Sequence, residues 1–120
     1  MPPEPQSSPT GFLPLHPLEY RILLILLGGP SHGYAVVQEI EDREANLGTI
    51  YPANLYRRIR DLLSRGLLED ADPPESDQED SRRRYFRLTE MGRAVVEAET
   101  GRLRNLLEEA RDRGLLTAEA

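Results

Sequence analysis

The chain has 120 residues, 38% of them hydrophobic, which is enough for one domain with a modest core. It contains no cysteine, so disulfides and thiolate metal sites are excluded and a reducing compartment fits. No secretory signal peptide is recognisable, and the longest apolar run, residues 22–27, is far shorter than the ~20 residues that cross a bilayer. We therefore expect a cytoplasmic protein.

The formal net charge of −6 is unusual for a protein that binds nucleic acid. The charges are segregated, however. Arginines concentrate in residues 57–65 and 82–87, whereas acids concentrate in residues 69–80 and the C-terminal third. Because local fields follow the distribution of charge, the acidity of the whole chain does not exclude a basic binding face.

The N-terminal half predicts a flexible arm followed by two helices. Residues 1–17 hold six prolines, so we expect an arm without a packed element, from which Phe12, Leu13 and Leu15 could still contact the body. Residues 18–27 predict a central helix that is apolar nearly all round. After the Gly-Gly-Pro break, Ser31 is a candidate cap for a second helix over residues 33–45.

Residues 49–68 predict a recognition helix that is followed at once by a strand. Pro52 suits the first helical position, and Gly66 suits a left-handed C-terminal cap. One face is an apolar stripe, and the opposite face carries polar side chains that can pair with base edges, Asn with adenine and Arg with guanine. The apolar stripe is Leu55, Ile59, Leu62 and Leu63, and the polar face is Ala53, Asn54 and Arg57 with Arg60 at its flank. The alternative is an ordinary surface helix with solvated arginines.

A β-wing is predicted to follow this helix. Residues 67–70 form a short strand, residues 71–81 a polar loop, and residues 83–88 a return strand in which Tyr85 and Arg87 alternate with Phe86 and Leu88. Three arginines at the wing, residues 82–84, could reach phosphates or the minor groove, or pair with the acids of residues 72–80. We expect both.

The last helix is predicted over residues 90–113, with Thr89 as its N-cap and Gly114 as its end. Its apolar stripe is interrupted by Glu99 and Thr100, so it is not a strict leucine zipper. On a monomer the stripe would leave apolar surface in water, which favours a homodimer; the alternative is a helix folded back on its own domain. The predicted dimer residues are Val96, Leu103, Leu106, Leu107 and Ala110.

Four segments together resemble the PadR family of transcriptional regulators. They are residues 29–34 (GPSHGY), 52–57 (PANLYR), 66–68 (GLL) and 83–93 (RRYFRLTEMGR), within a similarity that covers residues 15–113. The resemblance is to the small subgroup with one helix after the wing. It implies a winged-helix homodimer that binds an inverted-repeat operator, usually as a repressor, and responds to a small hydrophobic or aromatic effector.

The chain also departs from the family pattern. Tyr51 stands where Ser is frequent, and Ala53-Asn54 replaces a usual Gly-Thr, which alters the expected base preference. Some members stack drugs between tryptophans of the last helix. This chain has no Trp and no aromatic residue between Gly92 and Gly114, so a site of that kind is not expected.

We therefore expect a mainly α fold with a small β-hairpin. Its parts are a flexible arm (1–17), a winged helix-turn-helix domain (18–89), a C-terminal dimerisation helix (90–114) and a frayed tail (115–120). The expected DNA contacts come from the start of the second helix, the recognition helix and the wing: Tyr34, Tyr51, Ala53, Asn54, Tyr56, Arg57, Arg60, Arg82, Arg83 and Arg84. The residues considered for an effector cavity are Leu13, Leu15, Leu103 and Leu106.

Several alternatives are weighed against these roles. Tyr34 could be a core aromatic and Tyr56 a flank packing residue, rather than phosphate or base contacts. His16 and His32 are too few for a metal site, and a hydrogen-bonding role is expected for His32. No nucleophile–base pair or carboxylate dyad is recognisable, so neither an enzyme nor a cofactor is expected. The rival functions are a winged-helix protein–protein module and a small-molecule sensor that does not bind an operator.

Overall fold

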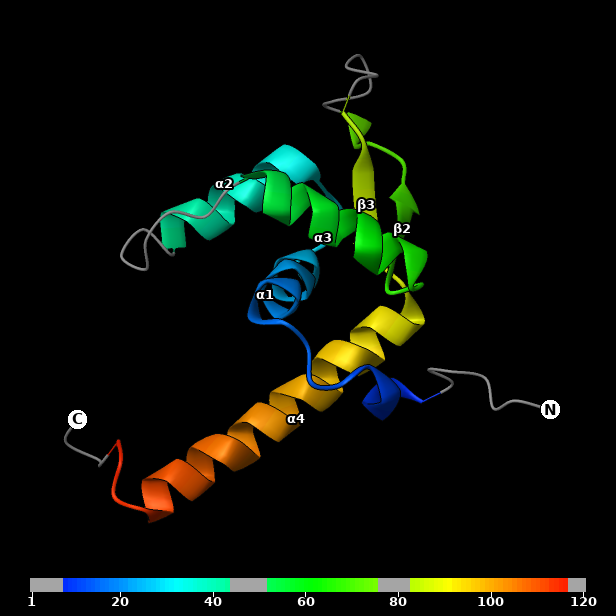
Figure 1. The fold of residues 1–120 in the computed structure, drawn as a ribbon. Helices are drawn as coiled ribbons and strands as arrows, with labels where there is room; N and C mark the ends of the chain where they lie inside the picture. The colour runs from blue at the N-terminus through cyan, green and yellow to red at the C-terminus, as the bar shows by residue number, and fades with distance from the viewer. Residues whose placement is uncertain (1–7, 44–51, 76–82, 117–120) are drawn as a thin grey trace.

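The computed structural model describes residues 8–43, 52–75 and 83–116. Within them the chain is mainly helical with a small antiparallel sheet (Figure 1). The elements in chain order are η1 (Pro9–Phe12), α1 (Pro17–Leu26), β1 (Ser31–His32), α2 (Gly33–Arg43), α3 (Pro52–Ser64), β2 (Leu68–Ala71), β3 (Tyr85–Leu88) and α4 (Glu90–Asp112).

Helix α1 is the centre of the helical body, because α2, α3 and α4 all pack against it. Its buried side chains include Ile22 and Leu23, both fully inaccessible to solvent. They meet Ile40 of α2 and Leu55 of α3 in one apolar cluster. Burial of such side chains is worth about 1.5–3 kcal/mol each, so this cluster fixes where α3 lies.

The sheet contains one strand more than the predicted hairpin. Its order is β1-β3-β2, with Ser31 opposite Phe86 and Leu68 opposite Leu88. The prediction that Ser31 caps α2 is wrong, because α2 begins at Gly33 and the residue directly before it is His32. His32 takes that role instead, and its Nδ1 accepts a hydrogen bond from the N–H of Ala35 at 3.1 Å. The hydrogen-bonding role expected for His32 is thus confirmed.

Strand β3 is more buried than a simple alternation predicts. Tyr85 and Phe86 are both buried, although they point to opposite faces, whereas Arg87 is exposed. The His32 ring stands edge-on to the Tyr85 ring, with 5.2 Å between centroids, and so covers a face that was expected to be open. The unpredicted strand β1 explains the difference, because it places His32 opposite Tyr85.

Part of the expected flexible arm is a packed element. The 3-10 helix η1 lies against α4, and Phe12 and Leu15 are buried in the core. The N–H of Leu15 donates to Oε2 of Glu99 at 2.8 Å. The expectation that residues 1–17 contain no packed element is therefore wrong from Pro9 onward. Residues 1–7 lie outside the described residues.

Helix α4 begins at a tight junction with the wing. Oγ1 of Thr89 accepts from the N–H of Gly92 at 2.9 Å, which confirms the predicted N-cap. The same hydroxyl donates to the carbonyl of Gly66 at 2.6 Å. A Cβ at Gly92 would lie 2.0 Å from the carbonyl oxygen of Leu67, so only glycine permits this approach.

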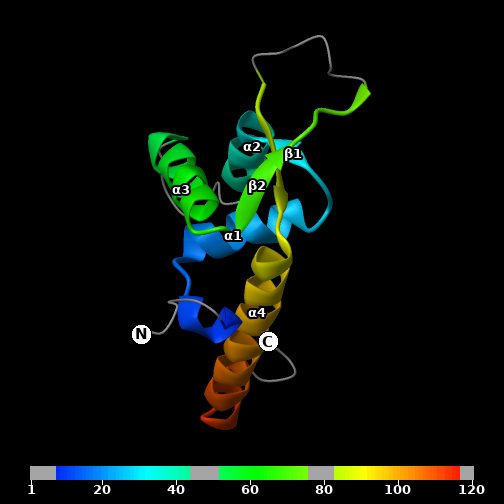
Figure 2. The same ribbon diagram turned by 90° about the vertical axis from the view of Figure 1, so that its right-hand side faces the viewer.

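The two halves of α4 have different environments. The first half packs on the body and buries Val95 and Val96 almost completely. Val96 was expected at a dimer interface, but its side chain is only 1% exposed and is used by its own core. The second half stands away from the body, at the opposite end from the wing (Figures 1 and 2), and leaves Leu106 and Leu107 exposed. None of the helices described here is long and apolar enough to span a membrane.

Candidate nucleic-acid interface

Helix α3 presents a polar face away from the core. It begins at Pro52, as predicted, and the chain turns after it at Gly66, whose φ of +78° is the left-handed conformation that glycine adopts readily. Leu55, Ile59 and Leu62 are buried. On the other side Ala53, Arg57 and Arg60 are exposed and Asn54 is half-buried, so the two predicted faces of this helix are both present.

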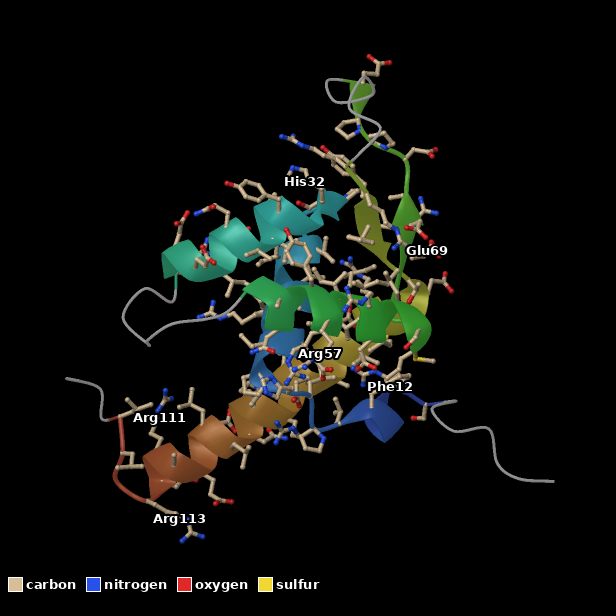
Figure 3. All side chains as sticks on the ribbon, turned by 45° about the horizontal axis from the view of Figure 1, so that its top comes forward. Phe12, His32, Arg57, Glu69, Arg111 and Arg113 are labelled. Carbon is tan, nitrogen blue, oxygen red and sulfur yellow. The ribbon has the colours of Figure 1, made fainter. Side chains whose placement is uncertain are left out.

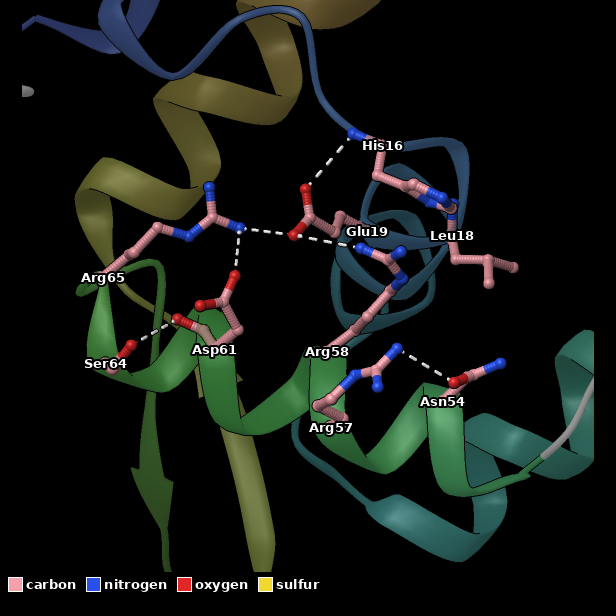
Figure 4. A network of polar contacts seen from close by, with 9 residues as sticks. All are labelled: His16, Leu18, Glu19, Asn54, Arg57, Arg58, Asp61, Ser64 and Arg65. Atoms are coloured by element: carbon pink, nitrogen blue, oxygen red, sulfur yellow. Dashed lines mark hydrogen bonds and ion pairs between the residues drawn. The ribbon is translucent and has the colours of Figure 1, made fainter.

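The two residues expected to read bases contact each other. A terminal nitrogen of Arg57 donates to Oδ1 of Asn54 at 3.0 Å (Figure 4). Paired recognition of adenine needs that oxygen of Asn54, whereas the Arg57 guanidinium keeps further N–H groups for a guanine edge. The geometry therefore favours Arg57 as the group that reaches outward and Asn54 as the side chain that orients it.

Two further arginines, one in α3 and one just after it, hold α3 to α1. Arg65 donates to Oε2 of Glu19 at 2.6 Å, and Arg58 lies 3.7 Å from the same oxygen (Figure 4). Asp61 accepts a second contact from Arg65 at 3.1 Å. The N–H of His16 donates to the other oxygen of Glu19 at 3.2 Å. The predicted basic stretch is thus divided between anchoring arginines (58 and 65) and presented arginines (57 and 60).

Two tyrosines lie where α2 and α3 meet: Tyr34 at the start of α2, and Tyr56 on α3. The side chain of Tyr34 is 62% exposed, which rules out a role as a core aromatic. Tyr56 is 37% exposed, and its ring packs so closely on Gly33 that a Cβ there would lie 2.8 Å from Cε1 of Tyr56. Gly33 therefore lets α3 approach α2, while the hydroxyl ends of both tyrosines remain available as hydrogen-bond donors.

The described part of the wing carries three exposed arginines, of which Arg83 and Arg84 precede β3 and Arg87 lies within it. Nε of Arg84 donates to Oδ1 of Asp70 at 2.6 Å, and a terminal nitrogen donates to Oδ2 at 3.1 Å. These bonds hold the pKa of the Asp70 carboxyl below its ordinary value. Arg84 also lies over the Phe86 ring, 5.4 Å from its centroid. Arg84 therefore pairs with Asp70 on β2, and not with one of the acids of residues 72–80 that were expected as partners.

These elements line a partly open pocket of about 310 Å³. Its lining includes the apolar side chains of Ile59 and Phe86 and the rings of His32, Tyr34 and Tyr56. Three arginines from α3 and the wing, residues 60, 83 and 84, complete it. Figure 3 labels His32, in β1 directly before α2, which lines the pocket, and Arg57 on α3, which does not.

Some predicted site residues fall outside the described residues. They are Tyr51, Arg82 and the wing-loop acids Asp77, Glu79 and Asp80, and their roles stay predictions. The predicted effector residues are described, and their environments differ. Leu15 is 7% exposed within the core, Leu13 packs against that core, and Leu106 is 49% exposed on the far half of α4.

No cluster of three or more His, Asp or Glu side chains that could hold a metal ion occurs among residues 8–43, 52–75 and 83–116. The two histidines serve as helix caps. His16 accepts from the N–H of Leu18 at 3.0 Å at the start of α1, and Glu19 completes the capping box by accepting from the N–H of His16. Sequence reasoning missed the role of Glu19, although His-Pro-Leu-Glu has the spacing of a capping box.

Comparison with known proteins agrees with this geometry. The family model of the transcriptional regulator PadR-like family matches residues 22–98. An uncharacterized protein of Lysinibacillus sphaericus is 32% identical over 79 residues, which cover 66% of this chain and 71% of that protein.

Solved structures are similar in fold. A transcriptional regulator from Clostridium thermocellum superposes with a TM-score of 0.63 and 22% identity, covering 82% of this chain and 90% of that one. A cysteine mutant of MarR from E. coli gives a TM-score of 0.70 at 17% identity, covering 95% and 75%. RosR of H. salinarum gives 0.59 at 24% identity, covering 90% and 84%. At these identities the likeness concerns the winged-helix fold.

Proposed function

Because the chain belongs to the PadR-like family of transcriptional regulators, we propose that it is a homodimeric repressor that binds an inverted-repeat operator through α3. The family consists of transcription regulators rather than enzymes. The proposal concerns the finer properties: which residues contact DNA, how two copies associate and whether binding represses.

The observation that supports the proposal most is that the arginines of α3, with Arg65 directly after it, divide into two groups with different contacts. Arg58 and Arg65 are bound to Glu19, so α3 is held rigidly on α1. Arg57 and Arg60 remain exposed on the outer face. A helix that is fixed on one side and carries exposed arginines on the other fits the major groove of a duplex.

The flanking groups fit the sugar–phosphate backbone on either side of that groove. Tyr34, at the start of α2, and Tyr56 have hydroxyls that can donate to phosphate oxygens. On the other side Arg83 and Arg84 lie where the wing loop leads into β3, a position from which guanidinium groups can reach the minor groove. We therefore assign base reading to Arg57, with Ala53 and Asn54 beside it, and backbone contacts to the remaining residues.

Dimerisation is assigned to the second half of α4. Leu106 and Leu107 are exposed there on a single chain, and Leu103 is partly buried. A second copy that covers these leucines would remove apolar surface from water. Two-fold symmetry would then present two α3 helices to successive major grooves, about 34 Å apart, which is the geometry of an inverted repeat.

The test is binding of the purified full chain to a labelled duplex from the promoter next to its own gene, measured by gel shift and fluorescence anisotropy at several salt concentrations. We expect a sequence-specific shift and a salt slope that corresponds to roughly six to ten phosphate contacts per dimer. Sedimentation velocity at micromolar concentration should give the mass of a dimer.

Two results would contradict the proposal: a monomer at those concentrations, or no preference for the promoter over random duplex in dilute salt. The second result would favour a winged-helix protein–protein module, which the acidic net charge of −6 also suits. Placing a reporter gene behind the same promoter separates repression from activation.

A further inference from the structure

We propose that His32, in its neutral form, donates a hydrogen bond from Nε2 to a phosphate of the DNA backbone. The phosphate would lie in the pocket between α2, α3 and the wing, which the His32 ring lines. This contact rests on the proposed function and adds to it a residue that is not among the DNA contacts expected from the sequence.

The cap on α2 determines which nitrogen of the ring carries the hydrogen. His32 directly precedes α2, and its Nδ1 accepts from the N–H of Ala35 at 3.1 Å. A ring nitrogen that accepts a hydrogen bond has no hydrogen of its own, so the neutral ring carries its one N–H at Nε2. Protonation of Nδ1 would replace the cap with two donors that face each other. The cap therefore favours the neutral ring, with Nε2 as a donor.

The ring is held in place, and its Nε2 is accessible. It is stacked on Tyr34, with 6.3 Å between centroids and 14° between planes, and stands edge-on to Tyr85. Within the described ranges of the chain, Nε2 of His32 has no hydrogen-bond partner. Buried side-chain nitrogens or oxygens without a partner occur, among these residues, only in Arg58 and Arg65, so Nε2 is open to solvent. A donor that is already oriented loses little conformational entropy on binding.

The charges around the ring favour an anion as the acceptor. Arg60, Arg83 and Arg84 line the same pocket, and no carboxylate is among the described residues that line it. Arg60 belongs to α3 and the other two precede β3, so the pocket lies between the helix and the wing that are assigned to DNA. A backbone phosphate has several acceptor oxygens. One can accept from the imidazole N–H while others accept from guanidinium groups.

Two asparagine variants isolate the contribution of Nε2. In His32→Asn the amide oxygen takes the place of Nδ1 and keeps the cap, but no donor reaches the position of Nε2. We expect this variant to bind the promoter duplex and a random duplex about three- to tenfold more weakly, because a phosphate contact does not depend on sequence. His16→Asn makes the same change at the cap of α1, where His16 accepts from the N–H of Leu18, and should leave DNA binding unchanged.

Urea unfolding of both variants checks that they are folded under the binding conditions. Equal affinities of wild type and His32→Asn would overturn the contact. The tautomer is tested without DNA, from the imidazole ¹⁵N shifts of the wild type, assigned with the two variants. We expect the hydrogen of His32 at Nε2, and a hydrogen at Nδ1 would overturn the neutral donor.

The salt dependence separates a neutral donor from a cation. A neutral donor releases no counterion, so the slope of log K against log salt should be the same for His32→Asn and wild type. Arg60→Gln is the comparison, and its slope should fall by about 0.9 for each phosphate contact that is lost. A fall of that size in His32→Asn would mean that His32 binds as a cation, which would overturn the neutral form.

Methylphosphonate substitution locates the phosphate. Promoter duplexes that each carry one neutral methylphosphonate per half-site are titrated with wild type and with His32→Asn. At one position we expect the substitution to weaken binding of the wild type at least about threefold more than that of the variant. Absence of any such position would overturn the contact. Failure of the wild type to bind any duplex would contradict the proposed function itself, whereas normal binding with equal losses would contradict the role of His32 alone.

Discussion

Glu99 of α4 accepts a hydrogen bond from the backbone N–H of Leu15 at 2.8 Å, across 84 positions of sequence. The carboxylate is buried, with 1% of the residue exposed, and Arg102 donates to both of its oxygens. The Arg102 hydrogen bond and the Leu15 N–H hold the pKa of Glu99 below its ordinary value of 4.5, against the effect of burial. This contact joins the N-terminal segment to α4.

Glu99→Gln should lower the free energy of unfolding at pH 7 by about 1–3 kcal/mol, because the amide can still accept from Leu15 but no longer carries the charge that Arg102 pairs with. Urea unfolding at fixed protein concentration measures this loss. Glu97→Gln is the matched control, because the ion pair of Glu97 with Arg93, at 3.5 Å, is exposed to solvent. The unfolding free energy should change by less than about 0.5 kcal/mol in that variant.

The same variant should change the response to acid. A carboxyl whose pKa is lower in the folded state stabilises the fold fully above its ordinary pKa of 4.5 and loses that contribution as pH falls through the lowered value. The stability difference between wild type and Glu99→Gln should therefore be constant above about pH 5 and shrink below 4.5. A difference that persists undiminished to about pH 3 would contradict the ionic role.

Glu19→Gln should also destabilise the protein, because it removes the charge shared by Arg58 and Arg65. Both arginine side chains are 24% exposed and would lose a charged partner, at a loss of about 1–3 kcal/mol. Glu39→Gln breaks an exposed pair with Arg43 and serves as the control, with little expected change in unfolding free energy. Equal effects of the two substitutions would mean that Glu19 does not anchor α3.

Two glycines of α4 should respond in opposite ways to alanine. Gly92→Ala should lower the unfolding free energy by about 2–3 kcal/mol, since the new Cβ would meet the Leu67 carbonyl oxygen. Gly101→Ala should raise it by about 0.5–1 kcal/mol, because no atom of the described chain lies within 4 Å of the added methyl and alanine favours helix. Thermal or urea unfolding of the pair at one protein concentration tests both signs.

Arg57→Ala should weaken operator binding by about 1–3 kcal/mol per half-site and relax base preference at one position of each half-site. Asn54→Ala should have a smaller effect on affinity, because Asn54 acts by orienting the Arg57 guanidinium. Selection of preferred duplexes from a randomised pool, followed by anisotropy, separates the two roles. Uniform weakening across all sequences would identify Arg57 as a phosphate contact instead.

Asp70→Asn should strengthen DNA binding at low salt, because Arg84 would no longer be held by a carboxylate. One extra phosphate contact per protomer would change the slope of log K against log salt by about 0.9 for each contact. Glu69→Gln releases Arg87 on the other face of the wing and should leave the slope unchanged. Identical slopes for Asp70→Asn and wild type would argue against a phosphate contact by Arg84.

The sequence predicted the elements that have strong local signals. The stripe of α3, the proline at its start, the glycine after it and the Thr89 cap are all determined by residues within a few positions, and all are confirmed. The two-residue strand β1 is too short to show an alternating pattern. It exists because Ser31 and His32 pair with β3, more than fifty positions later.

Long-range contacts explain the other differences. Glu99 was an interruption of an apolar seam, and nothing near it in sequence indicates Leu15 as its partner. Glu19 is similar: a carboxylate in an apolar helix is recognisable, but Arg65 lies 46 positions away. Val96 belongs to the same stripe as Leu106, and only the packing of η1 and α1 on α4 separates a core position from an exposed one.

The close backbone contact between Gly92 and Leu67 restricts bending at the junction of the wing and α4. If two copies join through the ends of their α4 helices, each winged-helix part is rigidly connected to the dimer interface. The distance between the two α3 helices then cannot change through movement of one winged-helix part alone. The dimer should therefore bind much more weakly to operators with one base pair more or fewer between half-sites. The length of α4 would set the half-site spacing that the dimer accepts.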